Sequence, residues 1–160
     1  MATCLGLNPE QIQQGLDSAR GLKHRLETIR VKNGFVLGDC YNANPLSMQK
    51  AIEHWIALEP ELPHRAILGD MLELGDQSPM YHQMIGAILS EMSFESLITV
   101  GELSKCYRPE DKALSYQHYD TVEEALSAID VVTYTQGSIT LIKASHGIHL
   151  EKMLTGLGDS

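Results

Sequence analysis

Hydrophobic residues occur in two spacings along this chain, and the two alternate. Compact apolar runs predict buried strands at 35–39 (FVLGD), 65–70 (RAILGD), 96–101 (SLITVG) and 139–145 (ITLIKAS). Between them, apolar residues spaced three and four apart predict amphipathic helices. Continuous apolar runs, as opposed to alternating ones, are typical of strands that are covered on both faces of a sheet.

Local signals place the helices. One is expected to begin near Pro45 and another at Ser78-Pro79, while Asp120 with Glu123 has the spacing of a capping box. A short helix is expected over 149–154. The side chains expected to point inward are Met48, Ala51, Ile52, Trp55, Ile56, Met84, Ile85, Ile88, Leu89, Val122, Ala125, Leu126 and Ile129.

The start of the pattern is different. The runs 26–31 and 35–39 are separated by an Asn-Gly pair, which predicts a β-hairpin. Strands and helices alternate after it, so the predicted fold is α/β: a doubly wound, mainly parallel sheet with helices on both faces, opened by a hairpin. Residues 1–20 precede the hairpin as a separate helix that Gly21 ends.

Composition narrows the class of protein. The chain has 160 residues, 43% of them hydrophobic and 21% charged, as in an ordinary globular domain. No apolar run approaches the length of a membrane span, and the first residues lack the basic start of a signal peptide. Cys4, Cys40 and Cys106 are too far apart for a zinc site and are expected to be reduced thiols. We therefore expect a cytoplasmic protein without membrane insertion.

The charge is acidic overall but locally basic. A net charge of −9 argues against a nucleic-acid partner, which needs clustered positive charge. Five Lys and Arg residues nevertheless fall within positions 20–32, together with His24. This cluster is either a solvated arm or a local site for an anion.

Three predicted strands end in polar or Gly-rich turns, and in doubly wound folds ligands bind at that end. In 38–45 (GDCYNANP), Asp39 could accept hydrogen bonds from ribose hydroxyls, and Asn42 or Asn44 could pair with a purine edge. The alternative is structural: Asn44-Pro45 is also a helix cap, and Asp39 a turn residue at the end of a strand.

The residues of the other two turns could likewise have either a ligand role or a structural role. Asp70 and Glu73 in 69–75 (GDMLELG) are either ligand groups or parts of a surface turn. In 143–147 (KASHG), Lys143 could reach an anion, with Ser145 and His146 beside it. The alternative for Lys143 is a buried strand end with a snorkelling side chain.

Missing motifs exclude two enzyme classes. The chain has neither a G-x-x-x-x-G-K-[ST] phosphate loop nor a G-x-G-x-x-G turn after a strand. It is therefore neither a complete P-loop ATPase nor an ordinary NAD domain. The histidines have no metal-binding spacing, and no metal site is expected within the chain.

Taken together, the motifs resemble the C-terminal domain of the Mur ligases, and within that family the members that use D-alanyl-D-alanine. The similarity covers nearly the whole chain and lies in 24–27 (HRLE), 39–48 (DCYNANPLSM), 68–75 (LGDMLELG), His82 with Gly86, 98–101 (ITVG) and 142–154 (IKASHGIHLEKML).

The resemblance implies a Rossmann-like domain, residues 21–160, that closes over a central ATPase domain whose tail is residues 1–20. It implies an ATP-dependent ligase that joins D-alanyl-D-alanine to UDP-N-acetylmuramoyl-tripeptide for peptidoglycan synthesis, with the magnesium ligands mainly in the central domain. The UDP-linked substrate would be held by the other domains. By itself the C-terminal domain is expected to be inactive.

Residue by residue, the resemblance implies nucleotide binding by His24, Arg25, Asp39, Tyr41, Asn42 and Asn44. It implies substrate binding by Asp70, Glu73, Lys143, Ser145 and His146. The chain departs from the family pattern at Gly38 and Cys40, where an acid and a serine are usual, and at Ala144 and His146, where a glycine and an arginine are usual. Histidine cannot make the bidentate fork that arginine makes with a carboxylate.

Two other functions remain open from the sequence. The chain could be a stand-alone nucleotide- or metabolite-binding module without catalysis, or a structural domain whose polar turns are only caps. An upstream phosphate loop in the parent reading frame would favour the ligase.

Overall fold

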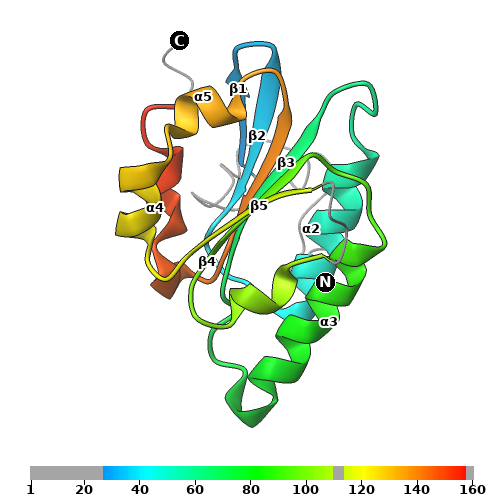
Figure 1. The fold of residues 1–160 in the computed structure, drawn as a ribbon, viewed down its shortest axis with the longest axis vertical. Helices are drawn as coiled ribbons and strands as arrows, with labels where there is room; N and C mark the ends of the chain where they lie inside the picture. Colours follow the sequence, from blue (N-terminus) through cyan, green and yellow to red (C-terminus); the bar gives the residue numbers. More distant parts are fainter. Residues whose placement is uncertain (1–26, 110–113, 158–160) are drawn as a thin grey trace, which may run out of the picture.

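Within the part of the chain that the structure describes, residues 27–109 and 114–157 of a computed structural model, six strands form one sheet (Figure 1). The order is β1-β2-β6-β3-β4-β5. Among the described strands only β1 is antiparallel to its neighbour, so the sheet is mainly parallel, as predicted. The strands are β1 (Glu27–Val31), β2 (Gly34–Asp39), β3 (His64–Gly69), β4 (Ser96–Val100), β5 (Ser115–Tyr119) and β6 (Ile139–Lys143).

The predicted hairpin is β1 and β2. Val31 is paired with Gly34, and Asn33 between them has φ 56°, which asparagine tolerates better than most residues. Gly34 is needed for a different reason, close packing. A Cβ at this position would lie 2.2 Å from the carbonyl oxygen of Ser138, just before β6. The Asn-Gly pair thus serves both the turn and the close approach of the next strand.

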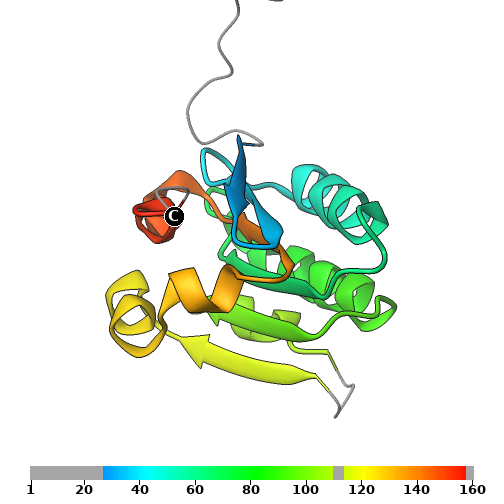
Figure 2. The same ribbon diagram turned by 90° about the horizontal axis from the view of Figure 1, so that it is seen from above.

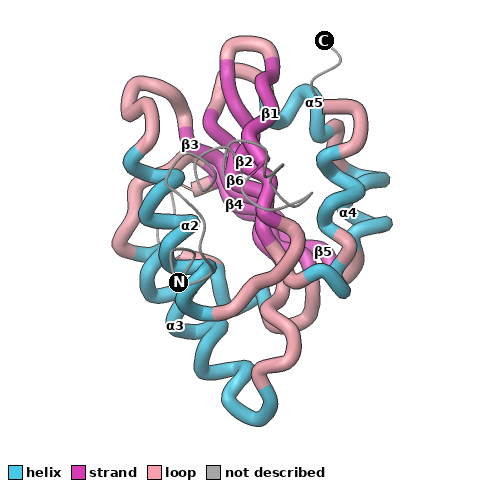
Figure 3. The backbone as a smooth tube through the Cα atoms, turned by 180° about the vertical axis from the view of Figure 1, so that it is seen from behind, coloured by secondary structure: helices cyan, strands magenta, loops and turns pink. Residues whose placement is uncertain are grey.

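Helices cover both faces of the sheet, which confirms the doubly wound class. On one face lie α2 (Pro45–Ala57) and α3 (Ser78–Ser90), and on the other lie α4 (Val122–Ala128), α5 (Val131–Thr135) and the 3-10 segment η5 (Leu150–Leu154) (Figures 2 and 3). Short 3-10 turns complete the list: η2 (Gly75–Gln77), η3 (Ser104–Tyr107) and η4 (His146–Ile148).

Each central strand supplies both hydrophobic cores, because successive side chains point to opposite faces. Leu37, Ala66 and Leu97 belong to the core under α2 and α3. Val36, Ile67 and Ile98 belong to the core under α4, α5 and η5. This explains why the strand sequences are continuous apolar runs.

In the sheet, β6 lies between β2 and β3. The last strand along the chain is therefore inserted between the first two parallel strands. The carboxyl ends of β2, β6 and β3 lie side by side, since Asp39 and Leu68 are both register partners of Lys143. The three polar turns that follow these strands therefore lie next to one another, at the carboxyl end of the sheet.

Several local expectations were wrong. Strand β5 was not predicted, because its sequence SYQHY is polar and it lies at the edge of the sheet. The short helix α5 was not predicted either. Thr121, not Asp120, caps α4 through a bond from the amide of Glu124 (3.2 Å).

Two side chains that were expected to point inward, Met84 and Leu126, are exposed, and His82 is buried on α3.

Candidate functional site

One serine ties the three polar turns together. The Ser145 hydroxyl donates to the carbonyl of Ala43 (3.2 Å) and accepts from the amide of Leu72 (2.9 Å). The Ser145 amide donates to the carbonyl of Asp70 (3.0 Å). The turns after β2, β3 and β6 are thereby held in one arrangement, although they are far apart in the sequence.

A hollow of about 390 Å³ lies between these turns, lined by Tyr41, Asn42, Leu72, Glu73, Ser145, His146 and Gly147. Five of these seven residues were predicted from the sequence. Leu72 and Gly147 were not. A Cβ on Gly147 would lie 2.7 Å from the Leu72 side chain, so the glycine allows these two walls to meet.

Several side chains at this hollow are not engaged by the rest of the described protein. The side chains of Asn42 and Glu73 make no hydrogen bond or ion pair with another described residue, and the ring of His146 contacts only that of His149, edge to face at 5.8 Å. Glu73 has φ 63°, an uncommon conformation for a residue other than glycine. An amide, a carboxylate and an imidazole are therefore available to a ligand there.

A buried ion pair lies where β2 and β6 end. Lys143 is fully buried, and its ammonium donates to Asp39 (2.5 Å) and to the carbonyl of Asn42 (2.9 Å). Burial, together with the nearby carboxylates of Glu151 and Asp39, raises the pKa of the neighbouring Cys40 thiol to about 12. The structural alternative for Lys143, a buried residue at the end of a strand, is therefore observed, and its ligand role stays a prediction.

Two other predicted site residues also have structural partners. The carboxylate of Asp70 is buried and accepts from the amides of Ser104 (2.7 Å) and Leu103 (3.2 Å), which closes the turn after β4. Asn44 caps α2: its side chain accepts from the amide of Ser47 (2.9 Å), and the Ser47 hydroxyl accepts in return (3.0 Å). The capping alternative for Asn44 is confirmed, while ligand roles for both residues stay predictions. His24 and Arg25 lie outside the described residues.

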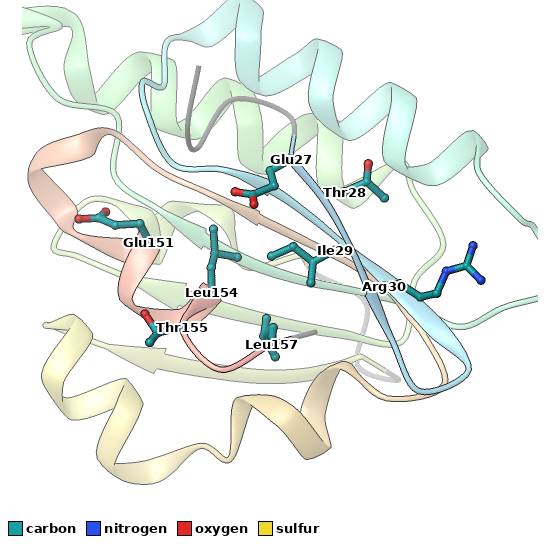
Figure 4. Close-up of a pocket in the computed structure, with 8 residues that line it drawn as sticks. All are labelled: Glu27, Thr28, Ile29, Arg30, Glu151, Leu154, Thr155 and Leu157. Atoms are coloured by element: carbon teal, nitrogen blue, oxygen red, sulfur yellow. The ribbon is translucent and has the colours of Figure 1, made fainter. Parts of the chain in front are cut away.

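A second hollow, of about 510 Å³, lies between β1 and the end of the described chain (Figure 4). Glu27 and Ile29 point toward Leu154 and Leu157, whereas Arg30 points the other way. Glu27 and Leu157 are the first and last described residues. Among the predicted site residues that the structure describes, none lines this hollow.

In residues 27–109 and 114–157 no cluster of three His, Cys, Asp or Glu residues is arranged to hold a metal ion. In the same ranges no helix is long and apolar enough to cross a bilayer.

The family follows from the fold and from these motifs. A family model described as "Mur ligase, glutamate ligase domain" matches residues 24–146, so the chain belongs to the Mur ligase family. A crystal structure of MurF from Acinetobacter baumannii superposes with a TM-score of 0.80 at 30% identity, over 99% of this chain and 35% of that one. The chain thus corresponds to a Mur ligase C-terminal domain, and its Rossmann-like fold is confirmed.

Two curated relatives with similar sequences have the same protein name. The UDP-N-acetylmuramoyl-tripeptide–D-alanyl-D-alanine ligase of Bacillus subtilis is 33% identical over 162 residues, covering 97% of this chain and 35% of the relative. The enzyme of that name from Buchnera aphidicola is 32% identical over 160 residues, covering 98% and 34%. The chain therefore spans about a third of the length of these relatives.

A more distant structure supports the fold alone. MurF from Thermotoga maritima, solved in complex with ADP, is 22% identical and has a TM-score of 0.73 over 95% of this chain.

Proposed function

We propose that this chain is the C-terminal domain of an ATP-dependent ligase that joins D-alanyl-D-alanine to UDP-N-acetylmuramoyl-tripeptide in peptidoglycan precursor synthesis. The observation that carries the proposal is the meeting of three family motifs around one hollow, in a chain that matches ligases of that name over nearly its whole length. On the same ground, residues 1–20 are the tail of the central domain and residues 21–160 the domain itself.

The hollow suits a zwitterionic dipeptide. The Glu73 carboxylate can accept hydrogen bonds from an ammonium group. His146 can donate from its ring to a carboxylate, with one bond where arginine would make two. Ser145 shapes the wall, because its hydroxyl is already bonded to two of the turns.

We assign ATP to the neighbouring side of the hollow, near Tyr41, whose side chain is 45% exposed. This assignment rests on the family resemblance, and MurF from Thermotoga maritima is itself known in complex with ADP. The other residues assigned to the nucleotide are Asp39, Asn42 and Asn44, with His24 and Arg25 outside the described ranges. Magnesium ligands are assigned mainly to the central domain, because the resemblance places the phosphate loop there.

In this scheme ATP phosphorylates the terminal carboxylate of the UDP-linked peptide, and the dipeptide amine displaces phosphate to form the amide. The contribution of this chain is to orient the amine and to exclude water from the acyl phosphate when the domain closes. The domain alone is inactive because the acyl phosphate forms on the central domain. A reaction that consumes ATP and a UDP-linked precursor places the enzyme in the cytoplasm.

The test is a turnover assay on the full-length product of the reading frame that contains this chain. ADP release is expected only when ATP, UDP-N-acetylmuramoyl-tripeptide and D-alanyl-D-alanine are all present, and L-alanyl-L-alanine is the matched control. Mass spectrometry should show the UDP-linked product enlarged by the dipeptide less one water. ATP binding without turnover would favour the stand-alone module, and equal turnover with the L,L-dipeptide would contradict the assigned substrate.

A further inference from the structure

His82 on α3 is fully buried and lies against the turn that carries two walls of the hollow. Its Nε2 is 3.0 Å from the amide nitrogen of Met71, and its Nδ1 is 2.7 Å from the carbonyl oxygen of Ser78. An amide N–H can only donate and a carbonyl oxygen can only accept. Both bonds exist together only in the neutral tautomer that carries its proton on Nδ1.

The surroundings of the ring favour this state. The ring of Tyr107 is stacked on that of His82 at 5.4 Å, nearly parallel. The Asp70 carboxylate lies 4.0 Å from Nε2, but the amides of Leu103 and Ser104 already donate to it. The geometry leaves Nε2 as the acceptor for the Met71 amide alone.

The position of the ring is also fixed by close packing of α3. Gly86 lies one turn after His82, and a Cβ there would lie 2.0 Å from the carbonyl oxygen of Cys106 in η3. Helix α3 therefore approaches η3 more closely than any larger residue at Gly86 would allow. The ring is held between α3 and Tyr107.

The turn after β3 is thus held from two sides at consecutive amides. His82 accepts from Met71, and Ser145 accepts from Leu72. Leu72 and Glu73, which follow directly, line the hollow. The position of the Glu73 carboxylate depends on both bonds, because a backbone shift at Met71 is carried along the chain.

We propose that His82 is a positioning residue for the hollow: as its Nδ1–H tautomer it holds the Met71 amide and so fixes the turn that presents Leu72 and Glu73. The inference rests on the proposed function only for what the hollow binds. The hydrogen-bond role itself is independent of the ligand.

Two substitutions separate the two ring nitrogens. In His82→Gln the side-chain oxygen falls near the place of Nε2, so the acceptor for Met71 is kept and the donor to Ser78 is lost. In His82→Asn the amide group falls near the place of Nδ1, so the reverse holds. Tyr107→Phe is the matched control: it keeps the stacked ring and removes a buried hydroxyl that donates to the carbonyl of Gly69 (3.3 Å).

The first measurement is the tautomer, by ¹⁵N NMR of the histidine rings in the unsubstituted chain. A protonated Nδ1 and an unprotonated Nε2 are expected at His82. The opposite tautomer or an imidazolium would overturn the proposal, and this readout needs no variant and no ligand.

The second measurement is hydrogen exchange at the Met71 amide. Exchange is expected to be about tenfold faster in His82→Asn, as for one lost hydrogen bond, and near the unsubstituted rate in His82→Gln and Tyr107→Phe. Equal acceleration in both His82 variants would overturn the role of Nε2. Should His82→Asn not fold, unchanged exchange in His82→Gln supports the role, and accelerated exchange there contradicts it.

The third measurement is kinetic, in the full-length ligase. In His82→Asn the KM for D-alanyl-D-alanine is expected to rise about tenfold with the KM for ATP unchanged, and His82→Gln should restore it. An equal rise in both KM values would indicate a general loss of structure. Absence of dipeptide-dependent turnover in the unsubstituted enzyme would refute the proposed function, while the tautomer and the exchange rates would still decide the role of His82.

Discussion

Two groups of polar side chains lie at the carboxyl end of the sheet, and they differ in whether they bond to the rest of the protein. Lys143, Asp39, Asp70 and Asn44 are bonded to other parts of the described chain. Asn42, Glu73 and His146 face a hollow, and their side chains form no hydrogen bond or ion pair with the described residues around them. In the sequence the two groups are interleaved, and each contains carboxylate, amide and basic side chains.

The difference teaches where each group acts. A buried polar group needs a partner, so engaged side chains stabilise the edge and fix its turns. Unengaged side chains at a hollow can exchange water for a ligand at little structural cost. Substitutions in the first group should therefore lower stability, and those in the second should lower affinity.

The largest effect is expected from Lys143→Met. It removes the ammonium and leaves the Asp39 carboxylate without its cation, which should lower the free energy of unfolding by about 3 kcal/mol. Urea denaturation measures this. Lys50→Met, which breaks the exposed pair with Glu53 (2.7 Å), is the control and should leave the free energy of unfolding nearly unchanged, because water screens this pair. Unchanged stability with weakened substrate binding would move Lys143 to the ligand-facing group.

Glu73→Gln should have the reverse profile. In the full-length ligase the KM for D-alanyl-D-alanine is expected to rise by about 10- to 100-fold, since a charge-assisted hydrogen bond to the ammonium is lost. Stability should not change. Glu102→Gln removes the same charge from the exposed turn after β4 and should leave this KM as it is. A loss of stability in Glu73→Gln would place Glu73 with the engaged group.

Cys40, next to Asp39, should make the stability of the protein depend on pH. Its pKa is raised in the folded state from 9.0 to about 12, mainly by burial, so unfolding releases a proton above pH 9. The contribution to stability is complete below pH 9 and falls by about 1.4 kcal/mol per pH unit as the pH rises toward 12.

The measurement is the free energy of unfolding of the unsubstituted chain and of Cys40→Ser between pH 9 and pH 12, and the quantity of interest is the difference between the two. The difference removes the contribution of Tyr134, whose pKa is also raised to about 12 by burial. A slope that stays the same after the substitution would show that the thiol is not shielded in the folded state.

Asn44→Ala should have the smallest effect. Loss of the cap on α2 is expected to lower the free energy of unfolding by about 1 kcal/mol, because the Ser47 amide loses its acceptor. Ser47→Ala, which removes the other half of the capping box, should behave alike. A raised KM for ATP in Asn44→Ala alone would give Asn44 the nucleotide role that the family resemblance implies.

The sequence by itself determined the elements and the class of fold. Hydrophobic spacing is a local property, so the strands predicted at 35–39, 65–70, 96–101 and 139–145, the helices at Pro45 and Ser78 and the opening hairpin were confirmed. The cap at Asn44 was recognised as an alternative because capping needs only neighbouring residues. Strand β5 was missed because an exposed edge strand needs no apolar run.

Only the tertiary structure decided which polar residues are engaged. Asp39 and Lys143 are 104 residues apart and became partners because β6 inserts beside β2. The same insertion brings Ser145 onto the turns after β2 and β3 and leaves Glu73 and Asn42 at a hollow. Residue type and spacing indicate what a side chain can bond to, but its partner is set by strand order, which depends on the packing of the whole sheet.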